Sequence, residues 1–316
     1  MEIEFVAFDS FGVKSMCTRV VTKDCSVVID PGIAWEEESF PLSYGERVYL
    51  DLKYTRAIKN ACKKSDVIVI THYHYDHHIP EAGLYKRKVV LLKDPNKNIN
   101  RSQKERARYL LGLIGDKADV RIADGKEFRF GKTKIVFSEA LWHGPVGTKL
   151  GKVVMCCVDD GKERLLFTSD LDGPYIRRYV DLIVSFKPDY LIIDGFPSYL
   201  LGFIASFANL RKVLKNTIDI LKKTKCKWYI IDHHLLRDYR YREIYYEVYR
   251  YAKESGKKVL SAAEMLGKKP KVIEGYEKYG PTRWKNWQDF DWRYLDRVIK
   301  RAKRVAKAKS KRKRFS

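Results

Sequence analysis

All seven histidines of this 316-residue chain lie in three short stretches, and each stretch comes after an apolar run. The histidines are His72, His74, His77, His78, His143, His233 and His234. The first four follow Val67–Thr71, His143 comes after Ile135–Phe137, and the last two follow Trp228–Ile231. Strands that end at the same edge of a sheet bring their last residues together. We therefore expect the imidazoles to converge on one site.

The spacing in the first stretch fits a pair of divalent metal ions. His72 and His74 are two residues apart, so both side chains can leave a strand end on the same side. Asp76 and His77 follow, and Pro80 indicates that a helix begins nearby. Two ions require imidazole and carboxylate ligands from several strands. Asp170, which follows the apolar run 165–168, supplies a bridging carboxylate.

Each of these residues also has a structural interpretation. A single histidine at a strand end, such as His143, is often a structural residue with satisfied hydrogen bonds, and an aspartate such as Asp170 often forms a turn or caps a helix. The run from His72 to His78 is different, because four histidines and an aspartate are costly to bury without a metal or acidic partners. This run favours the metal-site hypothesis for the isolated residues as well.

His72-x-His74-x-Asp76-His77 resembles the HxHxDH signature of the metallo-β-lactamase superfamily. The other motifs of that superfamily follow the same order along residues 1–266: an early strand-ending Asp30, then His143, Asp170 and a final histidine. The resemblance implies an α/β fold, a four-layer αβ/βα sandwich with the metals at one edge of the paired sheets. It is strongest to an uncharacterised, largely archaeal branch.

The resemblance also implies roles for the matching residues. Asp30 is expected to orient the metal-binding loop from behind the ligands. Asp76 and Asp170 are expected to be the catalytic carboxylates. The expected ligands are His72, His74 and His143 on the first metal, Asp76, His77 and the last histidine on the second, and Asp170 between them. Zinc is the first expectation because imidazole dominates the ligand set, with manganese or iron as alternatives.

Several assignments stay open at this level. The last ligand is either His233 or His234, and His233 is favoured because Arg237 follows it by four residues, as in the tRNA 3′-processing branch. Further candidates for outer or competing roles are His78, Asp172 and Asp194. His78 is a candidate for a supporting hydrogen bond or a substrate contact, Asp172 for the bridging role, and Asp194 for an outer partner or a turn residue.

A dinuclear site of this kind activates water for attack on an ester, amide or phosphodiester. The chain has a net charge of +23, and the +12 that remains without the basic C-terminal tail favours an anionic substrate such as a phosphodiester. We consider two alternatives. One is a hydrolase of small thioesters or lactones, and the other is an RNA-binding factor that keeps the fold with little turnover.

The C-terminal segment, residues 267–316, differs in composition from the catalytic region 1–266. Residues 297–316 contain eleven Lys or Arg and no acidic residue, so the rest of the chain carries +12. Leu295, Val298, Ile299 and Ala302 have helical spacing, which predicts a basic helical extension that either docks on the body or contacts RNA. No apolar run is long enough to span a membrane.

The remaining composition suggests a cytoplasmic protein. Six cysteines lie mostly in apolar runs without any Cys-x-x-Cys pair, so buried free thiols are expected. Two glutamines beside 33% charged residues hint at a thermophilic source. The oligomeric state is not indicated.

Short strands in succession, followed by strands alternating with helices, predict how the site is positioned. The expected strands are 3–8, 19–23, 26–29, 67–71, 88–92, 133–137, 153–158, 164–168, 190–193, 228–231 and 258–260. Helices are predicted over 102–115 with a Ser102–Glu105 capping box, over 207–221, and from an Asp238 cap to Gly256. In the last helix a stripe of tyrosines is expected to pack on the sheet.

Overall fold

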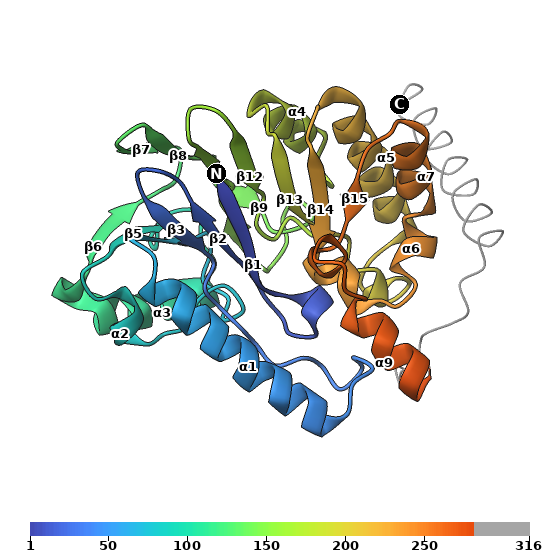
Figure 1. Ribbon diagram of the computed structural model, residues 1–316, viewed down its shortest axis with the longest axis horizontal. Coiled ribbons are helices and arrows are strands. Elements are labelled where there is room, and N and C mark those ends of the chain that lie inside the picture. The colour runs from blue at the N-terminus through green and yellow to red at the C-terminus, as the bar shows by residue number, and fades with distance from the viewer. Residues whose placement is uncertain (281–316) are drawn as a thin grey trace, which may run out of the picture.

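The computed structural model describes residues 1–280 and contains two large β-sheets packed face to face (Figure 1). The first sheet has the strand order β1-β2-β3-β4-β5-β6, and β3 to β6 are parallel. The second has the order β15-β14-β13-β12-β11-β8-β7, with β12 to β15 parallel. A short ribbon of β9 and β10 stands apart.

The strands are short, as the sequence predicts. In the first sheet they are β1 (Glu2–Phe8), β2 (Met16–Val21), β3 (Ser26–Ile29), β4 (Val67–Ile70), β5 (Val89–Leu92) and β6 (Asp119–Ile122). The second sheet and the ribbon contain β7 (Glu127–Phe130), β8 (Thr133–Phe137), β9 (Leu141–Trp142), β10 (Lys152–Val153), β11 (Cys156–Asp159), β12 (Arg164–Phe167), β13 (Tyr190–Asp194), β14 (Trp228–Asp232) and β15 (Val259–Leu260).

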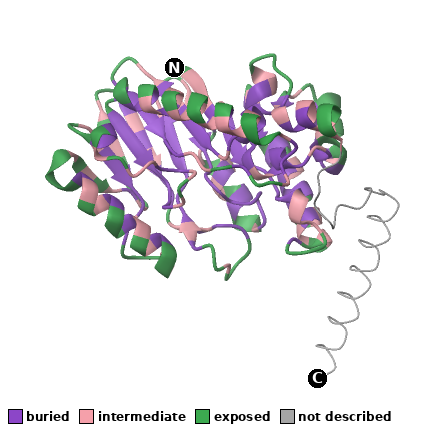
Figure 2. Ribbon diagram, turned by 90° about the horizontal axis from the view of Figure 1, so that it is seen from below, coloured by how far each residue is buried: buried purple, intermediate pink, exposed green. Residues whose placement is uncertain are grey.

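Helices cover the outer faces of both sheets. They are α1 (Tyr44–Lys63), α2 (Ala82–Tyr85), α3 (Arg101–Ile114), α4 (Arg177–Ser185), α5 (Phe207–Lys223), α6 (Tyr241–Ile244), α7 (Tyr246–Glu254), α8 (Ala262–Met265) and α9 (Lys271–Tyr279). Short 3-10 helices are η1 (Asp9–Phe11), η2 (Gly115–Lys117), η3 (Ser198–Leu200) and η4 (His233–Arg237). Seen from below, the strands are buried while the helices expose their outer sides (Figure 2).

The alternation of side chains along β4 shows how the sheets and helices form layers. Val67 and Val69 pack between the sheets, against residues of both, whereas Ile68 and Ile70 pack under α1 and α3. Both faces of the strand are therefore buried, so an unbroken apolar run is required rather than an alternating one. The same division holds in β12, where Phe167 faces the first sheet and Leu166 faces the helices of the second. The result is the predicted αβ/βα sandwich.

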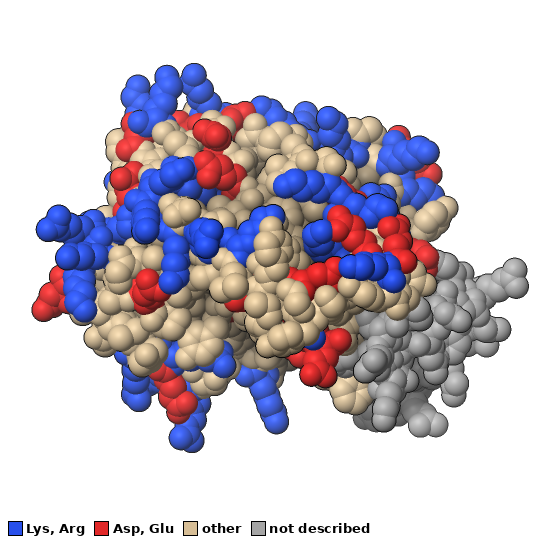
Figure 3. All heavy atoms as spheres, turned by 60° about the horizontal axis from the view of Figure 1, so that its bottom comes forward, with Lys and Arg blue, Asp and Glu red and all other residues tan. Residues whose placement is uncertain are grey.

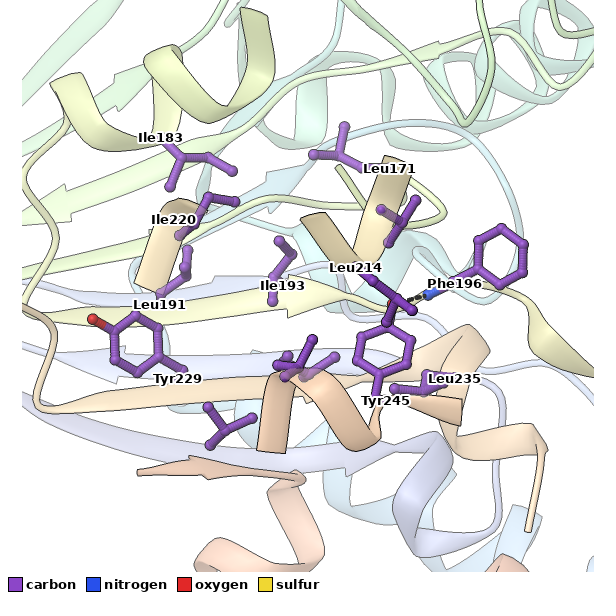
Figure 4. Close-up of a cluster of buried hydrophobic side chains, with 14 of the residues drawn as sticks. Leu171, Ile183, Leu191, Ile193, Phe196, Leu214, Ile220, Tyr229, Leu235 and Tyr245 are labelled. Atoms are coloured by element: carbon purple, nitrogen blue, oxygen red, sulfur yellow. Dashed lines mark hydrogen bonds between the residues drawn. The ribbon is translucent and has the colours of Figure 1, made fainter. Parts of the chain in front are cut away.

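Buried hydrophobic side chains form one cluster between the second sheet and the helices on its outer face (Figure 4). Leu191 and Ile193 of β13 pack in one cluster with Leu214 of α5. Tyr245 lies in the same cluster, and its hydroxyl accepts a hydrogen bond from the Phe196 backbone N–H at 2.9 Å. This tyrosine belongs to the predicted stripe, so the expectation that the stripe packs on the sheet is confirmed.

Three local predictions were wrong. The helix at 102–115 begins one residue earlier, and its cap is Asn100, whose side chain accepts from the Gln103 N–H at 2.7 Å. The predicted helix from Asp238 to Gly256 is divided into α6 and α7 at Tyr245, whose backbone (φ −94°, ψ 19°) leaves the helical range. The Asp238 side chain accepts from the Arg240 N–H and closes a turn before α6 instead of capping a helix. The predicted strand 153–158 is likewise divided between β10 and β11.

Within the described part of the chain, no helix is long and apolar enough to cross a membrane. All six cysteines are buried with free thiols, as predicted. The proposed division after residue 266 stays a prediction. Beyond that point α9 packs on the body, where Tyr276 stacks on Tyr239 with ring centroids 3.8 Å apart. The predicted basic extension falls outside the described residues from position 281 onward.

Candidate metal centre

A single carboxylate oxygen stands at the centre of the candidate site. Asp170 follows β12, and its Oδ2 lies 3.0 Å from His77 Nε2 and 3.3 Å from His143 Nε2. The same oxygen lies 3.4 Å from His233 Nε2 and 3.5 Å from His72 Nε2. These four histidines come from the ends of β4, β9 and β14. The structure therefore brings the separate sequence motifs together.

The potential ligands form two groups that share Asp170. In each group, one ligand atom from every residue lies within 4.8 Å of the others. The first group contains His72, His74, His143 and Asp170. The second contains Asp76, His77, Asp170 and His233. This division matches the ligand sets that the resemblance implies, with His233 in the place of the last histidine.

The other ring nitrogen of several histidines is held by a hydrogen bond. Asp30 Oδ2 lies 2.8 Å from Nδ1 of His77, and Asp9 Oδ2 lies 2.6 Å from Nδ1 of His233. Nδ1 of His72 lies 3.3 Å from the Thr71 hydroxyl. Such contacts fix the ring orientation and turn Nε2 toward the centre.

The backbone at the site is constrained. Positive φ values, which are uncommon for residues other than glycine, occur at Asp30 (50°), Ser169 (58°), Asp172 (52°) and His233 (59°). Strain of this kind gathers at functional sites. Gly32 is required for a different reason, since a Cβ there would lie 2.1 Å from the His78 backbone nitrogen. The loop after β3 therefore presses directly on the histidine-rich loop.

The remaining candidates lie behind or beside the two groups. His234 belongs to a separate cluster, with its Nδ1 3.0 Å from Asp194 Oδ1 and 3.4 Å from Asp172 Oδ1. Asp172 also lies 3.5 Å from Nδ1 of His143, so it supports a ring and does not take the central position. Asp194 also accepts a hydrogen bond from the Asp172 N–H, which makes it an outer partner. His78 Nδ1 lies 3.0 Å from the His74 carbonyl oxygen.

The buried histidines differ in the direction in which their surroundings shift the imidazole pKa. Burial lowers the pKa of His72 well below its ordinary value and lowers that of His74 to about 3, so both are neutral, as a metal ligand must be. Burial alone would also lower the pKa of His77 and His143, but neighbouring carboxylates raise both to about 10. Metal binding at these two rings would release their protons.

The donor set fits a pair of divalent ions. Among the described residues, Nε2 of His72 and Oδ1 of Asp170 are buried without a hydrogen-bond partner, and Nε2 of His77 and His233 is satisfied by no group outside the two ligand groups. Buried polar atoms normally have partners, and these unpartnered atoms all belong to the two groups. Imidazole and carboxylate are ligands that suit zinc and related transition metals.

Comparison with known proteins agrees with this geometry. The model of the metallo-beta-lactamase superfamily matches residues 11–79, which include Asp30 and the histidine-rich loop. The UPF0282 protein of Methanopyrus kandleri is 39% identical over 291 residues, covering 87% of this chain and 97% of that protein. A UPF0282 protein of Sulfurisphaera tokodaii is 39% identical over 285 residues, covering 88% and 92%. The chain belongs to the UPF0282 family.

Solved structures with lower sequence identity are also similar. The metallo-beta-lactamase fold protein YhfI from Bacillus subtilis is 13% identical, with a TM-score of 0.46, over 78% of this chain and 89% of that one. The expectation of a metallo-β-lactamase superfamily member within an archaeal branch is confirmed by the UPF0282 relatives and the superfamily match.

Sequence reasoning missed one residue of the site in this UPF0282 protein. Asp9 follows β1 in the same way as Asp30 follows β3, and it is fully buried. Its carboxylate binds His233 and also accepts from Nε of Arg237. The rule that a strand-ending aspartate marks the site, applied to the first strand, would have found it.

Proposed function

We propose that this UPF0282 protein is a hydrolase that depends on two divalent metal ions. The proposed ligands are His72, His74 and His143 for the first ion, Asp76, His77 and His233 for the second, and Asp170 for both. The observation that carries the proposal is the position of Asp170 Oδ2, within 3.5 Å of four imidazole nitrogens from three strand ends. A carboxylate in that position suits a bridging ligand.

Ions held in this way supply an acidified water for attack and positive charge for the substrate's developing oxyanion. The protein's own residues position the reaction. Asp30 and Asp9 hold the rings of His77 and His233 from behind, which fixes the direction of both lone pairs. The six cysteines are buried, so among the described residues none offers an exposed thiol nucleophile.

We propose a phosphodiester or another anionic ester as substrate, and this choice is supported by charge. Without the last twenty residues the chain still carries +12. Lys and Arg side chains are spread over much of the face in Figure 3, with Asp and Glu in smaller groups between them. A positive surface raises the local concentration of anionic substrates. We propose zinc as the metal, a cytoplasmic location, and RNA contact through the basic C-terminal segment.

Metal content and a paired assay test the proposal. Protein purified without chelating resin is expected to contain two metal equivalents per chain by mass spectrometry. The loaded protein is expected to hydrolyse bis(p-nitrophenyl) phosphate and to leave a generic thioester intact. Thioester activity alone would overturn the substrate assignment, and one equivalent of metal would overturn the dinuclear mechanism.

A pair of aspartate variants separates the site from the scaffold. Asp76→Ala removes a proposed ligand and is expected to abolish hydrolysis. Asp66→Ala is the matched control, because Asp66 caps the opposite end of the strands through Ser26, whose hydroxyl lies 2.6 Å away. Hydrolysis that is retained in Asp76→Ala would contradict its proposed role.

A further inference from the structure

A third group of potential metal ligands lies beside the first metal group and is not used by the proposed hydrolysis. It contains Asp172 on the loop after β12, Asp194 at the end of β13 and His234 in η4. One ligand atom from each residue lies within 4.8 Å of the other two. Both aspartates are buried, and His234 is partly exposed. The three side chains come from the same strand ends as the ligands of the two metal groups.

The separations in the third group match those in the two metal groups. Nδ1 of His234 lies 3.0 Å from Asp194 Oδ1 and 3.4 Å from Asp172 Oδ1. In the metal groups, Asp170 Oδ2 lies 3.0 Å from the nearest imidazole nitrogen and 3.5 Å from the fourth. Ligand atoms about 2.0–2.2 Å from one divalent ion are about 3–3.6 Å apart in tetrahedral or octahedral geometry. The third group therefore has the spacing of a coordination shell.

The two carboxylates of the third group have no lysine or arginine as an ion-pair partner among the described residues. Asp172 contacts the rings of His143 and His234, and Asp194 contacts that of His234. His143 carries no positive charge when its Nε2 binds a metal, because a ligating imidazole is neutral. One histidine then remains for two buried carboxylates, and a buried charge without compensation is costly. A divalent cation would balance both carboxylates.

A nitrogen of His143 without a hydrogen-bond partner faces the third group. The side chain of His143 is 1% exposed, and in the described part of the chain its Nδ1 has no hydrogen-bond partner. This nitrogen lies 3.5 Å from Asp172 Oδ1, while Nε2 of the same ring lies 3.3 Å from Asp170 Oδ2. When Nε2 binds the first metal, Nδ1 carries a proton, and a buried N–H normally has an acceptor. A water molecule bound to a cation in the third group would supply that acceptor.

We infer that Asp172, Asp194 and His234 bind a third divalent cation next to the first metal group. The ion takes the place of the proton between His234 Nδ1 and the Asp194 carboxylate. Two carboxylates and one imidazole suit manganese or zinc. The inference goes beyond the proposed dinuclear chemistry and does not depend on the identity of the substrate.

The third ion is expected to bind more weakly than the other two. Three protein ligands leave coordination positions open to water or to an oxygen of the substrate. His234 is partly exposed, whereas His72, His77, His143 and His233 of the two metal groups are buried. Protein purified without added metal is therefore expected to keep two ions and to take up the third only when metal is supplied.

Manganese binding to the zinc-loaded protein tests the site. Full-length protein that carries two equivalents of zinc is titrated with Mn²⁺, and free Mn²⁺ is measured by electron paramagnetic resonance. Manganese has a lower affinity than zinc for such ligands, so it does not displace zinc from the two metal groups. We expect one further equivalent of Mn²⁺ to bind. If neither Mn²⁺ nor a third equivalent of Zn²⁺ binds, the inference is wrong.

Variants of two proposed ligands attribute the added ion to the third group. His234→Gln and Asp194→Asn are each expected to weaken Mn²⁺ binding at least about tenfold while both zinc ions stay bound. Asp189→Asn is the matched control, because Asp189 lies at the other end of β13 from Asp194 and accepts from the Arg164 N–H. His234→Gln carries the test if Asp194→Asn does not fold. An added ion that binds His234→Gln as tightly as it binds the control is a surface ion, and this result would overturn the assignment.

The zinc content separates this inference from the proposed function. If the protein retains fewer than two zinc ions but binds one Mn²⁺ that is lost in His234→Gln and kept in Asp189→Asn, the third site stands and the dinuclear proposal fails. If two zinc ions are retained and no further ion binds, the third site alone is rejected. Because neither measurement requires turnover, both results are independent of the choice of substrate.

Discussion

At the scale of single residues, the site depends on carboxylates that hold imidazoles from behind. Asp9 contacts both His233 and Arg237 and so connects the first strand with the end of β14. Removing such a partner typically lowers metal affinity by about 10- to 100-fold. The role of Asp9 can therefore be measured without knowledge of the substrate.

We predict that Asp9→Asn weakens the second metal while the first is retained. The asparagine keeps the side chain's size but loses the negative charge that holds the His233 ring and the Arg237 guanidinium. Competition with a chelator, followed by metal analysis, should show a loss of affinity of about 10- to 100-fold at one of two sites. Asp66→Asn serves as control. If both variants retain both metals equally well, Asp9 does not support metal binding.

Glu36 predicts a pH dependence of stability. Its pKa is raised from 4.5 to about 8 by burial and by Asp9, while Arg237, Lys14 and His233 act in the opposite direction. The folded state therefore holds a proton that the unfolded state releases between these values. The resulting contribution is fully present below pH 4.5 and is lost as the pH rises to about 8, at about 1.4 kcal/mol per pH unit.

Glu36→Gln removes this ionisation. Urea unfolding of metal-free protein at several pH values should show the wild type losing stability relative to the variant between about pH 5 and pH 8, with no further relative loss above that range. A difference that does not change with pH would mean that Glu36 is not held in its neutral form.

At the scale of elements, local sequence patterns predicted the central strands well and the outer elements poorly. Strand β4 is buried on both faces, and its apolar run therefore indicated a buried strand clearly. Helix α1 was not predicted, because it buries few side chains over twenty residues and has a weak apolar stripe. The division of 153–158 between two sheets depends on a long-range contact, in which the Val154 N–H donates to the Thr71 carbonyl.

The sequence predicted more of the metal site than of the structure around it. The ligands follow a fixed spacing and stand at strand ends, so their meeting follows from sheet topology. The choice between His233 and His234 required coordinates, because adjacent residues after one strand differ only in the turn that directs them. His233 adopts φ 59° and faces Asp170, whereas His234 turns to Asp194.

Helix α9 gives a prediction at the element scale. A Cβ on Gly275 would lie 1.8 Å from the Pro41 carbonyl oxygen, so Gly275→Ala must displace the helix from the loop before α1. We expect a loss of about 1–3 kcal/mol in the free energy of unfolding, measured with urea. In the control, Gly112→Ala on the exposed side of α3, nothing lies within 4 Å, and a gain of about 0.5–1 kcal/mol is expected. Similar effects in both variants would contradict tight packing of α9.

At the scale of the whole molecule, positive charge is distributed unequally. Eleven of the Lys and Arg residues lie in the last twenty positions, and the remaining +12 belongs to the rest of the chain. The two parts therefore contribute separately to nucleic-acid binding. The metal centre lies entirely within the described residues, so chemistry and tail-mediated binding should be separable.

We predict that removing residues 297–316 weakens RNA binding and leaves the rate on a small phosphodiester within about twofold. Phosphate contacts release counterions, so the logarithm of affinity falls linearly with the logarithm of salt concentration, with a slope of about −0.7 per contact for single strands. Fluorescence anisotropy from 50 to 300 mM salt should therefore show a shallower slope for the truncated protein. If the two slopes are equal, the basic segment does not contact phosphate, and RNA binding, where present, depends on the metal-binding body alone.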